Sequence, residues 1–175
     1  MQKWLILDRD GVINFDSDQF IKSAQEWQAI PGSLEAIARC NQAGYRVVVI
    51  SNQSGIARGL FDLDTLNVIH DQLRTQLAAC GGELEQIYFC PHGPDDHCSC
   101  RKPLPGLFEQ FALEYQLELE TIYAVGDSLR DLQAAQAAGA RAILVRTGKG
   151  PRSLAALETL AEDDPLHQVP VYDDL

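Results

Sequence analysis

Two aspartates, Asp8 and Asp10, stand directly after the apolar run at residues 4–7. If that run is a buried strand, both carboxylates emerge where the strand stops, and Gly11 lets the chain turn away. Ligands of open α/β sheets bind at such carboxyl ends of strands. Two acids in this place suit a divalent cation and a phosphorylated substrate, and one acid is then free to attack the substrate.

Three further polar segments stand next to predicted elements. Ser51 follows the apolar run at residues 46–50, Asp127 follows the run at 122–125, and Lys102 precedes a helical pattern. Taken singly, Ser51 could be a helix or turn cap, Asp127 a helix cap and Lys102 an exposed loop cation. Their joint occurrence favours one site, because the carboxyl ends of strands in a doubly wound sheet converge on one crevice.

Short apolar, β-branched runs alternate with longer helical patterns. The predicted strands are residues 4–7, 46–50, 87–89, 122–125 and 142–145, with a further edge strand at 169–172; the predicted helices are residues 33–43, 65–79, 105–115, 131–138 and 153–160. Continuous apolar strands suit a parallel sheet covered on both faces, and short connections imply right-handed crossovers. We therefore expect an α/β fold with a doubly wound, mostly parallel, Rossmann-like sheet and helices on both faces.

Length and charge limit the classes of protein to consider. A chain of 175 residues predicts one domain, residues 1–175, with no room for a large cap. The net charge of −11 argues against a nucleic-acid or membrane partner. The first apolar stretch is short and is followed at once by charge, so we expect no signal peptide and a cytoplasmic location. The size and the lack of an obvious interaction helix favour a monomer.

Three cysteines and one histidine lie within 11 positions, at Cys90, His92, Cys98 and Cys100. Three thiolates and one imidazole are a complete tetrahedral set for a structural Zn²⁺. A redox disulfide, or unrelated thiols near a histidine, is the alternative, and a reducing compartment favours zinc. The predicted zinc loop, residues 90–100, directly precedes Arg101 and Lys102, so the metal would hold these two cations in place.

The motifs, in this order, resemble the haloacid dehalogenase superfamily of phosphohydrolases over nearly the whole chain. The resemblance implies that Asp8 is a nucleophile that forms an aspartyl-phosphate, and that Asp10 is the general acid and then the general base. Asp8, Asp127 and the backbone carbonyl of Asp10 would hold a catalytic Mg²⁺. Ser51 and Lys102 would contact the phosphoryl group. With Arg101, the implied catalytic set is Asp8, Asp10, Ser51, Arg101 and Lys102.

The Cys/His loop narrows the resemblance to a small, cap-less branch of that superfamily. This branch holds the D-glycero-D-manno-heptose 1,7-bisphosphate 7-phosphatases, which act in the ADP-heptose pathway to lipopolysaccharide, and the related histidinol-phosphate phosphatases. Arg101 would recognise the distal phosphate, because a guanidinium suits bidentate contacts. The implied contacts with a small phosphorylated sugar are Asp16, Ser17, Asp18, Gln19, Ser51, Asn52, Gln53, Ser54, Arg58, Arg101 and Lys102.

Several alternatives stay open at this point. Arg58 and Arg101 would favour a bisphosphate, whereas Asp16 and Asp18 would favour the cationic histidinol phosphate. A non-catalytic zinc-knuckle binding module, with the aspartates acting as caps, is the alternative from another class. Arg9 has no evident chemical role and is expected to be a surface or cleft-lining cation. The segment at residues 146–150 is given no catalytic role, and Asp131 is expected behind the metal ligands or on a metal-bound water.

Overall fold

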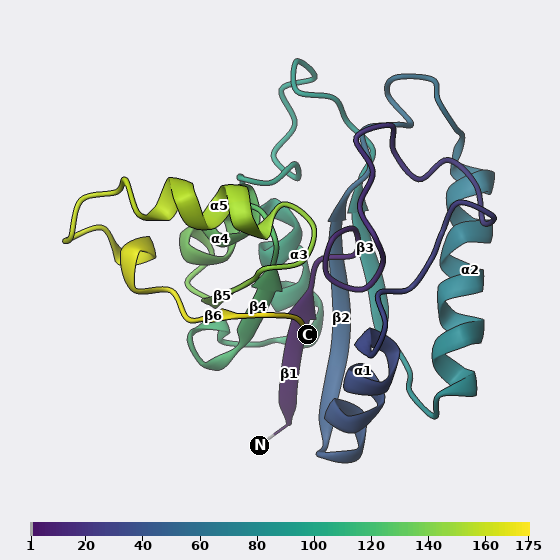
Figure 1. Cartoon of the computed structure of the whole chain (residues 1–175), viewed down its shortest axis with the longest axis horizontal. Coiled ribbons are helices and arrows are strands. Elements are labelled where there is room, and N and C mark those ends of the chain that lie inside the picture. The colour runs from purple at the N-terminus through teal and green to yellow at the C-terminus, as the bar shows by residue number, and fades with distance from the viewer. Residues whose placement is uncertain (1) are drawn as a thin grey trace.

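The computed structural model describes residues 2–175, built around a six-stranded sheet (Figure 1). The strands lie in the order β3-β2-β1-β4-β5-β6, and all neighbouring strands are parallel. The chain winds first to one side of β1 and then to the other, so the topological switch point lies between β1 and β4. The predicted doubly wound parallel sheet is confirmed. The strands are β1 Lys3–Leu7, β2 Tyr45–Asn52, β3 Gln86–Cys90, β4 Tyr123–Gly126, β5 Arg141–Val145 and β6 Val171–Tyr172.

Helices cover both faces of the sheet (Figure 1). Side chains of α1 and α2 share one core cluster, and side chains of α3 and α4 share the other. The last helix, α5, packs with α4 and β5 in a smaller third cluster. The helices are α1 Ser33–Gln42, α2 Leu63–Ala79, α3 Gly106–Tyr115, α4 Leu129–Ala137 and α5 Gly150–Leu157, with short 3₁₀ turns at Leu119–Thr121 and Pro165–Gln168.

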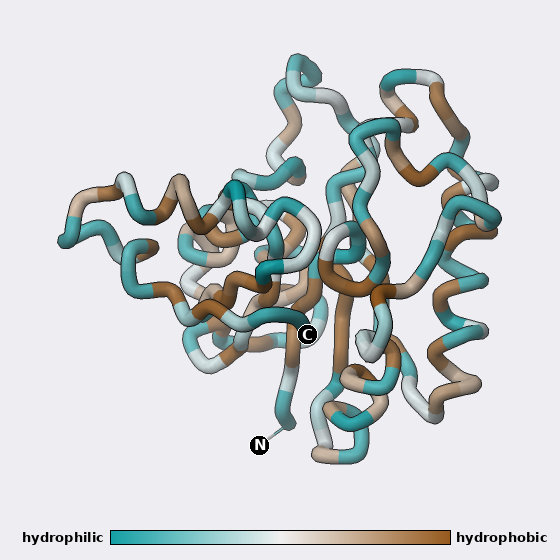
Figure 2. Tube along the Cα trace, viewed as in Figure 1, coloured by the Kyte–Doolittle hydropathy of each residue, from teal (hydrophilic) through white to brown (hydrophobic). Residues whose placement is uncertain are grey.

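Strand β1 shows why the apolar runs are continuous. Leu5 and Leu7 belong to the core cluster under α1 and α2, while Trp4 and Ile6 belong to the cluster under α3 and α4. Successive side chains of a strand point to opposite faces, so a sheet covered on both faces needs apolar residues at every position. Figure 2 shows this as apolar colour along the central strands, whereas many loop residues above them are polar.

Three helices begin two or three residues earlier than the sequence predicts. Helix α2 begins at Leu63 rather than at 65, because Asp62 is its N-cap and accepts from the Thr65 N–H. Helix α4 begins at Leu129 rather than at 131, with Ser128 as its N-cap. The Asp131 carboxylate accepts from the Ser128 backbone N–H at 2.9 Å and from its hydroxyl at 2.7 Å, which fixes this start. Helix α5 spans Gly150–Leu157 rather than 153–160. Its N-cap, Lys149, makes no side-chain capping bond, so the usual sequence signal for a helix start is missing there.

The long loops gather at the end of the sheet away from the N-terminus (Figure 1). These are residues 8–32 after β1, 53–62 after β2 and 91–105 after β3. No part of residues 2–175 forms a separate cap domain over them, as expected. Within that range, no helix has both the length and the apolar character needed to cross a membrane.

Candidate active site and metal centres

A cleft of about 280 Å³ opens at the carboxyl ends of β1, β2 and β4. It collects most of the predicted site residues, although they are scattered along the chain. Gln19 is exposed and does not line the cleft. Ser51 is buried and does not line the cleft either, and its hydroxyl accepts a hydrogen bond from the Gln53 amide at 2.8 Å. The predicted residues that line the cleft are Asp8, Asp10, Asp16, Ser17, Asp18, Asn52, Gln53, Ser54, Arg58, Arg101, Lys102 and Asp127.

Lys102 is the buried cation of the site. Its ammonium donates to Asp8 Oδ1 at 2.9 Å, to Asp131 Oδ1 at 2.6 Å and to the Ile50 carbonyl at 2.7 Å. Although burial lowers the pKa of Lys102, the charges of Asp131 and Asp8 raise it well above its usual value. The lysine therefore stays charged and draws the two carboxylates together.

Asn52 fixes the backbone that carries this lysine. Its amide nitrogen donates to the Lys102 carbonyl and its amide oxygen accepts from the Lys102 N–H, both at 3.0 Å. Asn52 is the last residue of β2, so the carboxyl end of this strand positions a lysine that lies 50 residues further along the chain. This clamp explains why polar residues follow the apolar part of β2.

Three carboxylates, those of Asp8, Asp127 and Asp131, form one potential cation site. Burial raises the pKa of both Asp8 and Asp127, and repulsion among the carboxylates raises them further. Asp131 differs: although burial raises its pKa, the Lys102 charge brings it below the usual value. The array thus carries negative charge that the protein compensates only in part, which suits a divalent cation.

The free oxygens show which carboxylates fit a metal. Asp131 uses Oδ1 for Lys102 and Oδ2 for the Ser128 backbone and hydroxyl. In contrast, no donor within residues 2–175 reaches Asp8 Oδ2 or Asp127 Oδ1. Mg²⁺ prefers hard oxygen ligands and binds through one or two carboxylates. These free oxygens therefore fit Mg²⁺ bound to Asp8 and Asp127. Asp131 instead forms an ion pair with Lys102.

The segment after β5 cradles Asp127. The Lys149 N–H donates to Asp127 Oδ2 at 2.7 Å, and the Ser153 hydroxyl donates to the Asp127 carbonyl at 2.8 Å. A Cβ at Gly148 or at Gly11 would overlap the Asp127 carboxylate, and both glycines have positive φ. The expectation that residues 146–150 carry no catalytic group is compatible with this supporting role.

The environment of Arg9 differs from the one predicted from the sequence. It is fully buried, not a surface or cleft-lining cation, and its guanidinium binds both oxygens of Asp10 at 2.9–3.1 Å. Its third nitrogen lies 3.3 Å from His70 Nε2. An arginine can only donate, so His70 accepts through Nε2; burial and the Arg9 charge lower the His70 pKa to about 3.

Four side-chain nitrogens, two of them from Arg9, donate hydrogen bonds to the Asp10 carboxylate. Besides Arg9, the side-chain amides of Asn14 and Gln53 donate to its carboxylate at 2.8 and 2.9 Å. Although burial raises the pKa of Asp10, the charge of Arg9 and these hydrogen bonds bring it below its usual value. Asp10 is therefore an oriented, anionic carboxylate at the cleft wall.

Replacing Arg9 by methionine should destabilise the fold. The substitution leaves the Asp10 carboxylate without its cation, and removing one partner of a buried pair costs about 3 kcal/mol in free energy of unfolding. Urea denaturation measures this cost. Arg146→Met is the matched control, because the Arg146–Asp173 pair is exposed and such pairs contribute about 0–1 kcal/mol. Equal losses in the two variants would contradict the assignment.

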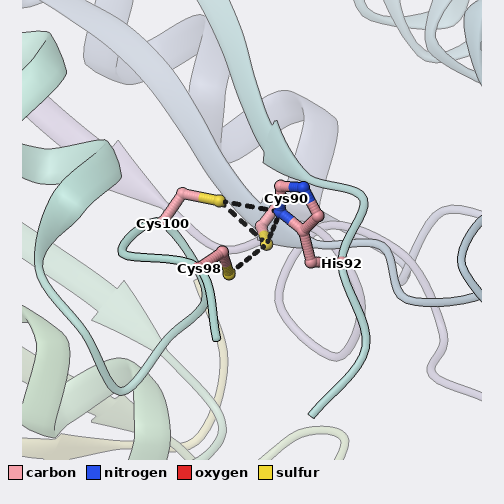
Figure 3. A group of neighbouring side chains, drawn as sticks. All are labelled: Cys90, His92, Cys98 and Cys100. Atoms are coloured by element: carbon pink, nitrogen blue, oxygen red, sulfur yellow. Dashed lines mark hydrogen bonds between the residues drawn. The ribbon is translucent and has the colours of Figure 1, made fainter. Parts of the chain in front are cut away.

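The second metal-binding group is the predicted zinc loop (Figure 3). The ligand atoms of Cys90, His92, Cys98 and Cys100 all lie within 4.8 Å of one another. The closest sulfurs, on Cys90 and Cys100, are 3.1 Å apart, well beyond the disulfide bond length of about 2.05 Å. All three thiols are free. Three sulfurs and one imidazole nitrogen converging in this way fit a tetrahedral Zn²⁺.

The zinc loop also anchors a cleft residue. The Arg101 guanidinium donates to the backbone carbonyl of His92 at 3.2 Å. His92 supplies one of the four candidate zinc ligands, so the position of Arg101 depends on the fold of this loop.

Two basic residues of the cleft were not predicted from the sequence. These are Lys149, which pairs with Asp16 at 2.5 Å, and Arg130 in the first turn of α4. Both follow strand ends, which is the signal that could have found them.

Comparison with known proteins agrees with this geometry. Residues 10–136 match the family model described as haloacid dehalogenase-like hydrolase. This chain belongs to the haloacid dehalogenase-like hydrolases. A second model of the same kind of hydrolase matches residues 99–175.

Relatives within the haloacid dehalogenase-like hydrolases share one activity by name. D-glycero-β-D-manno-heptose-1,7-bisphosphate 7-phosphatases from Bordetella bronchiseptica and Pseudomonas putida are 59% and 56% identical, over 87% of this chain and 86% and 87% of theirs. The crystal structure of the B. bronchiseptica D,D-heptose 1,7-bisphosphate phosphatase, complexed with magnesium and phosphate, superposes with a TM-score of 0.92. It is 55% identical and covers 98% of this chain and 93% of that one.

Proposed function

We propose that this chain is a Mg²⁺-dependent phosphatase that removes the C7 phosphate of D-glycero-β-D-manno-heptose 1,7-bisphosphate, a step toward the ADP-heptose of lipopolysaccharide. The observation that carries the proposal is the buried Lys102, which joins Asp8 to Asp131 beside Asp127 at the strand ends. The relatives that carry this name, at up to 59% identity, supply the substrate and its β anomer.

In the first step, an Asp8 carboxylate oxygen attacks the phosphorus atom of the C7 phosphate. The bond from phosphorus to the C7 oxygen breaks and Asp8 becomes an aspartyl-phosphate. Asp10, once it has taken up a proton from solvent beside the negatively charged phosphate, donates that proton to the leaving alkoxide. Lys102 lies on the Asp8 carboxylate and offsets the charge of the transferred phosphoryl group.

In the second step, a water molecule attacks the phosphorus atom of the aspartyl-phosphate. Asp10, now a carboxylate, removes a proton from that water, and the bond from phosphorus to Asp8 breaks. Inorganic phosphate leaves, Asp8 is restored, and the proton on Asp10 serves the next substrate. The contacts from Arg9, Asn14 and Gln53 favour the ionised carboxylate of Asp10, which is the form that accepts the proton from water.

Asp8 and Asp127, with the backbone carbonyl of Asp10, would hold the Mg²⁺. When bound, the cation offsets the negative charge that otherwise keeps a phosphate away from three carboxylates. Ser51 is buried next to the cleft residue Gln53, from which its hydroxyl accepts, and it donates no hydrogen bond within residues 2–175. Its hydroxyl proton is therefore available for a phosphoryl oxygen.

The structure bears on the choice between a bisphosphate and histidinol phosphate. Asp16 was one of two acids that favoured the cationic alternative, but its carboxylate is paired with Lys149 at 2.5 Å. A carboxylate already neutralised by a lysine attracts a second cation weakly. This contact favours the sugar bisphosphate, with Arg101 binding the distal phosphate.

We further propose that residues 1–175 form one catalytic domain, with the zinc loop at 90–100, and that the enzyme works as a monomer in the cytoplasm. Reducing conditions there keep Cys90, Cys98 and Cys100 available as zinc ligands. The net charge of −11 supports the absence of nucleic-acid partners.

A comparison of turnover of the two candidate substrates tests the proposed function. Heptose 1,7-bisphosphate and histidinol phosphate are assayed separately with Mg²⁺, and the two kcat/KM values are compared. We expect a preference of about 100-fold or more for the bisphosphate, since an unpaired cation beside Arg101 costs several kcal/mol. A preference for histidinol phosphate would overturn the substrate. No Mg²⁺-dependent turnover of any phosphate ester would favour the non-catalytic binding module instead.

A further inference from the structure

Three arginines line the cleft, namely Arg58, Arg101 and Arg130. Within residues 2–175, no carboxylate forms an ion pair with any of them. The chain has 25 acidic residues against 14 basic ones, so acids were available to neutralise them. An unneutralised cationic cluster in so acidic a chain indicates a place for an anion.

Each arginine comes from a different element and is oriented differently. Arg101 is tied to the His92 carbonyl of the zinc loop, and the Arg58 guanidinium lies 5.6 Å from the ring centre of Phe20. Arg130 is exposed in the first turn of α4 and has no hydrogen-bond partner within residues 2–175. Its guanidinium is therefore free to turn toward a ligand.

Arg130 stands where two clefts join. The active-site cleft adjoins a second cleft of about 320 Å³, which is lined by the zinc loop and the segment after it. The residues shared by both clefts are Pro94, Arg101, Lys102 and Arg130. Among these, Lys102 is occupied by Asp8 and Asp131, so the two arginines are the cations available to a ligand at the junction.

The first turn of α4 supplies one cation to the junction of the two clefts. Ser128, two residues before Arg130, is engaged with Asp131 and carries no charge. The α4 side of the junction therefore presents Arg130 as its cation.

We infer that Arg130 is a specificity-determining residue that binds, together with Arg101, the sugar phosphate that the enzyme does not cleave. The inference rests on the proposed function and deepens it. A sugar bisphosphate spans the cleft with one phosphate at Asp8 and Lys102 and the other at the junction of the two clefts. The guanidinium groups suit that second phosphate, and they repel a substrate with a cationic end.

The test compares two substrates that differ only in the distal phosphate. These are heptose 1,7-bisphosphate and heptose 7-phosphate, assayed with the wild type, Arg130→Gln and Arg130→Lys. We expect Arg130→Gln to lower kcat/KM for the bisphosphate by about 10- to 100-fold, mainly through KM, as for loss of a charged hydrogen bond. For heptose 7-phosphate we expect less than about a threefold change, and Arg130→Lys should restore part of the loss. Arg152→Gln, an exposed arginine of α5 outside both clefts, is the matched control.

A second readout does not depend on which phosphate ester is cleaved. Heptose 1-phosphate should inhibit hydrolysis of p-nitrophenyl phosphate, and Arg130→Gln should raise its inhibition constant about 10-fold or more. If the wild type fails to hydrolyse the bisphosphate, the proposed function is wrong, and this inhibition constant still tests Arg130. Equal losses for both substrates, or an inhibition constant that matches the wild type, would overturn the inference.

Discussion

Asp8→Asn should lower kcat by about 10⁴-fold or more, as expected when a covalent nucleophile is removed. Asparagine has the same shape, but its amide cannot displace the sugar alkoxide from phosphorus. The fold should persist, because Asp8 already repels Asp131 and removing its charge relieves part of that repulsion. The measurements are steady-state kcat with Mg²⁺, thermal unfolding, and rapid-quench detection of a phosphoryl group bound covalently to the wild type.

A matched control distinguishes the loss of the nucleophile from the general effect of replacing an aspartate by asparagine. Asp71→Asn makes the same chemical change at an exposed position of α2 that lines neither cleft, and it should turn over like the wild type. Activity within about 10-fold of the wild type in Asp8→Asn would exclude the covalent route through Asp8. A stable variant without turnover, together with a phosphoryl-enzyme in the wild type, would support it.

Loss of zinc should have the second-largest effect. Cys98→Ser removes one of four ligands, and we expect zinc content to fall from about one per chain, with a marked loss of thermal stability. Arg101 is held by a carbonyl within the zinc loop, whereas Lys102 is held by Asn52 of β2. We therefore expect kcat/KM to fall about 10- to 100-fold more for the bisphosphate than for heptose 7-phosphate, a loss like that of one charged contact.

Two cysteines outside the loop provide the controls. Cys40 and Cys80 are half-buried thiols packed against the other face of the sheet, and neither belongs to the zinc group. Cys40→Ser and Cys80→Ser should keep their zinc and their preference for the bisphosphate. A zinc-free Cys98→Ser protein that matches the wild type in stability and in substrate preference would show that the metal has no structural role.

Much of the chemistry could be inferred from local sequence. An apolar run that ends in Asp8 and Asp10 marks a strand end, and the close spacing of Cys90, His92, Cys98 and Cys100 marks a metal loop. These signals are short-range: they depend on alternation, turns and ligand types within a few residues. For the same reason, the order of strands and helices was predictable, while the starts of α2, α4 and α5 were displaced by two or three residues.

The sequence did not predict which charged side chains lie in contact with each other. Arg9 lies between two cleft aspartates and was expected to face solvent or the cleft, yet it is buried against Asp10 and His70, which is 61 residues away. Lys149 meets Asp16 across 133 residues, and Lys102 reaches Asp8 across 94.

The sequence by itself determined the reaction class and pointed to two candidate metal sites, because these depend on residue types at strand ends and in one short loop. The tertiary structure alone decided which carboxylates remain free for a cation, which lysine is already paired, and where unpaired arginines gather. Electrostatic energy depends on distance and burial in space, and spacing along the chain contains neither.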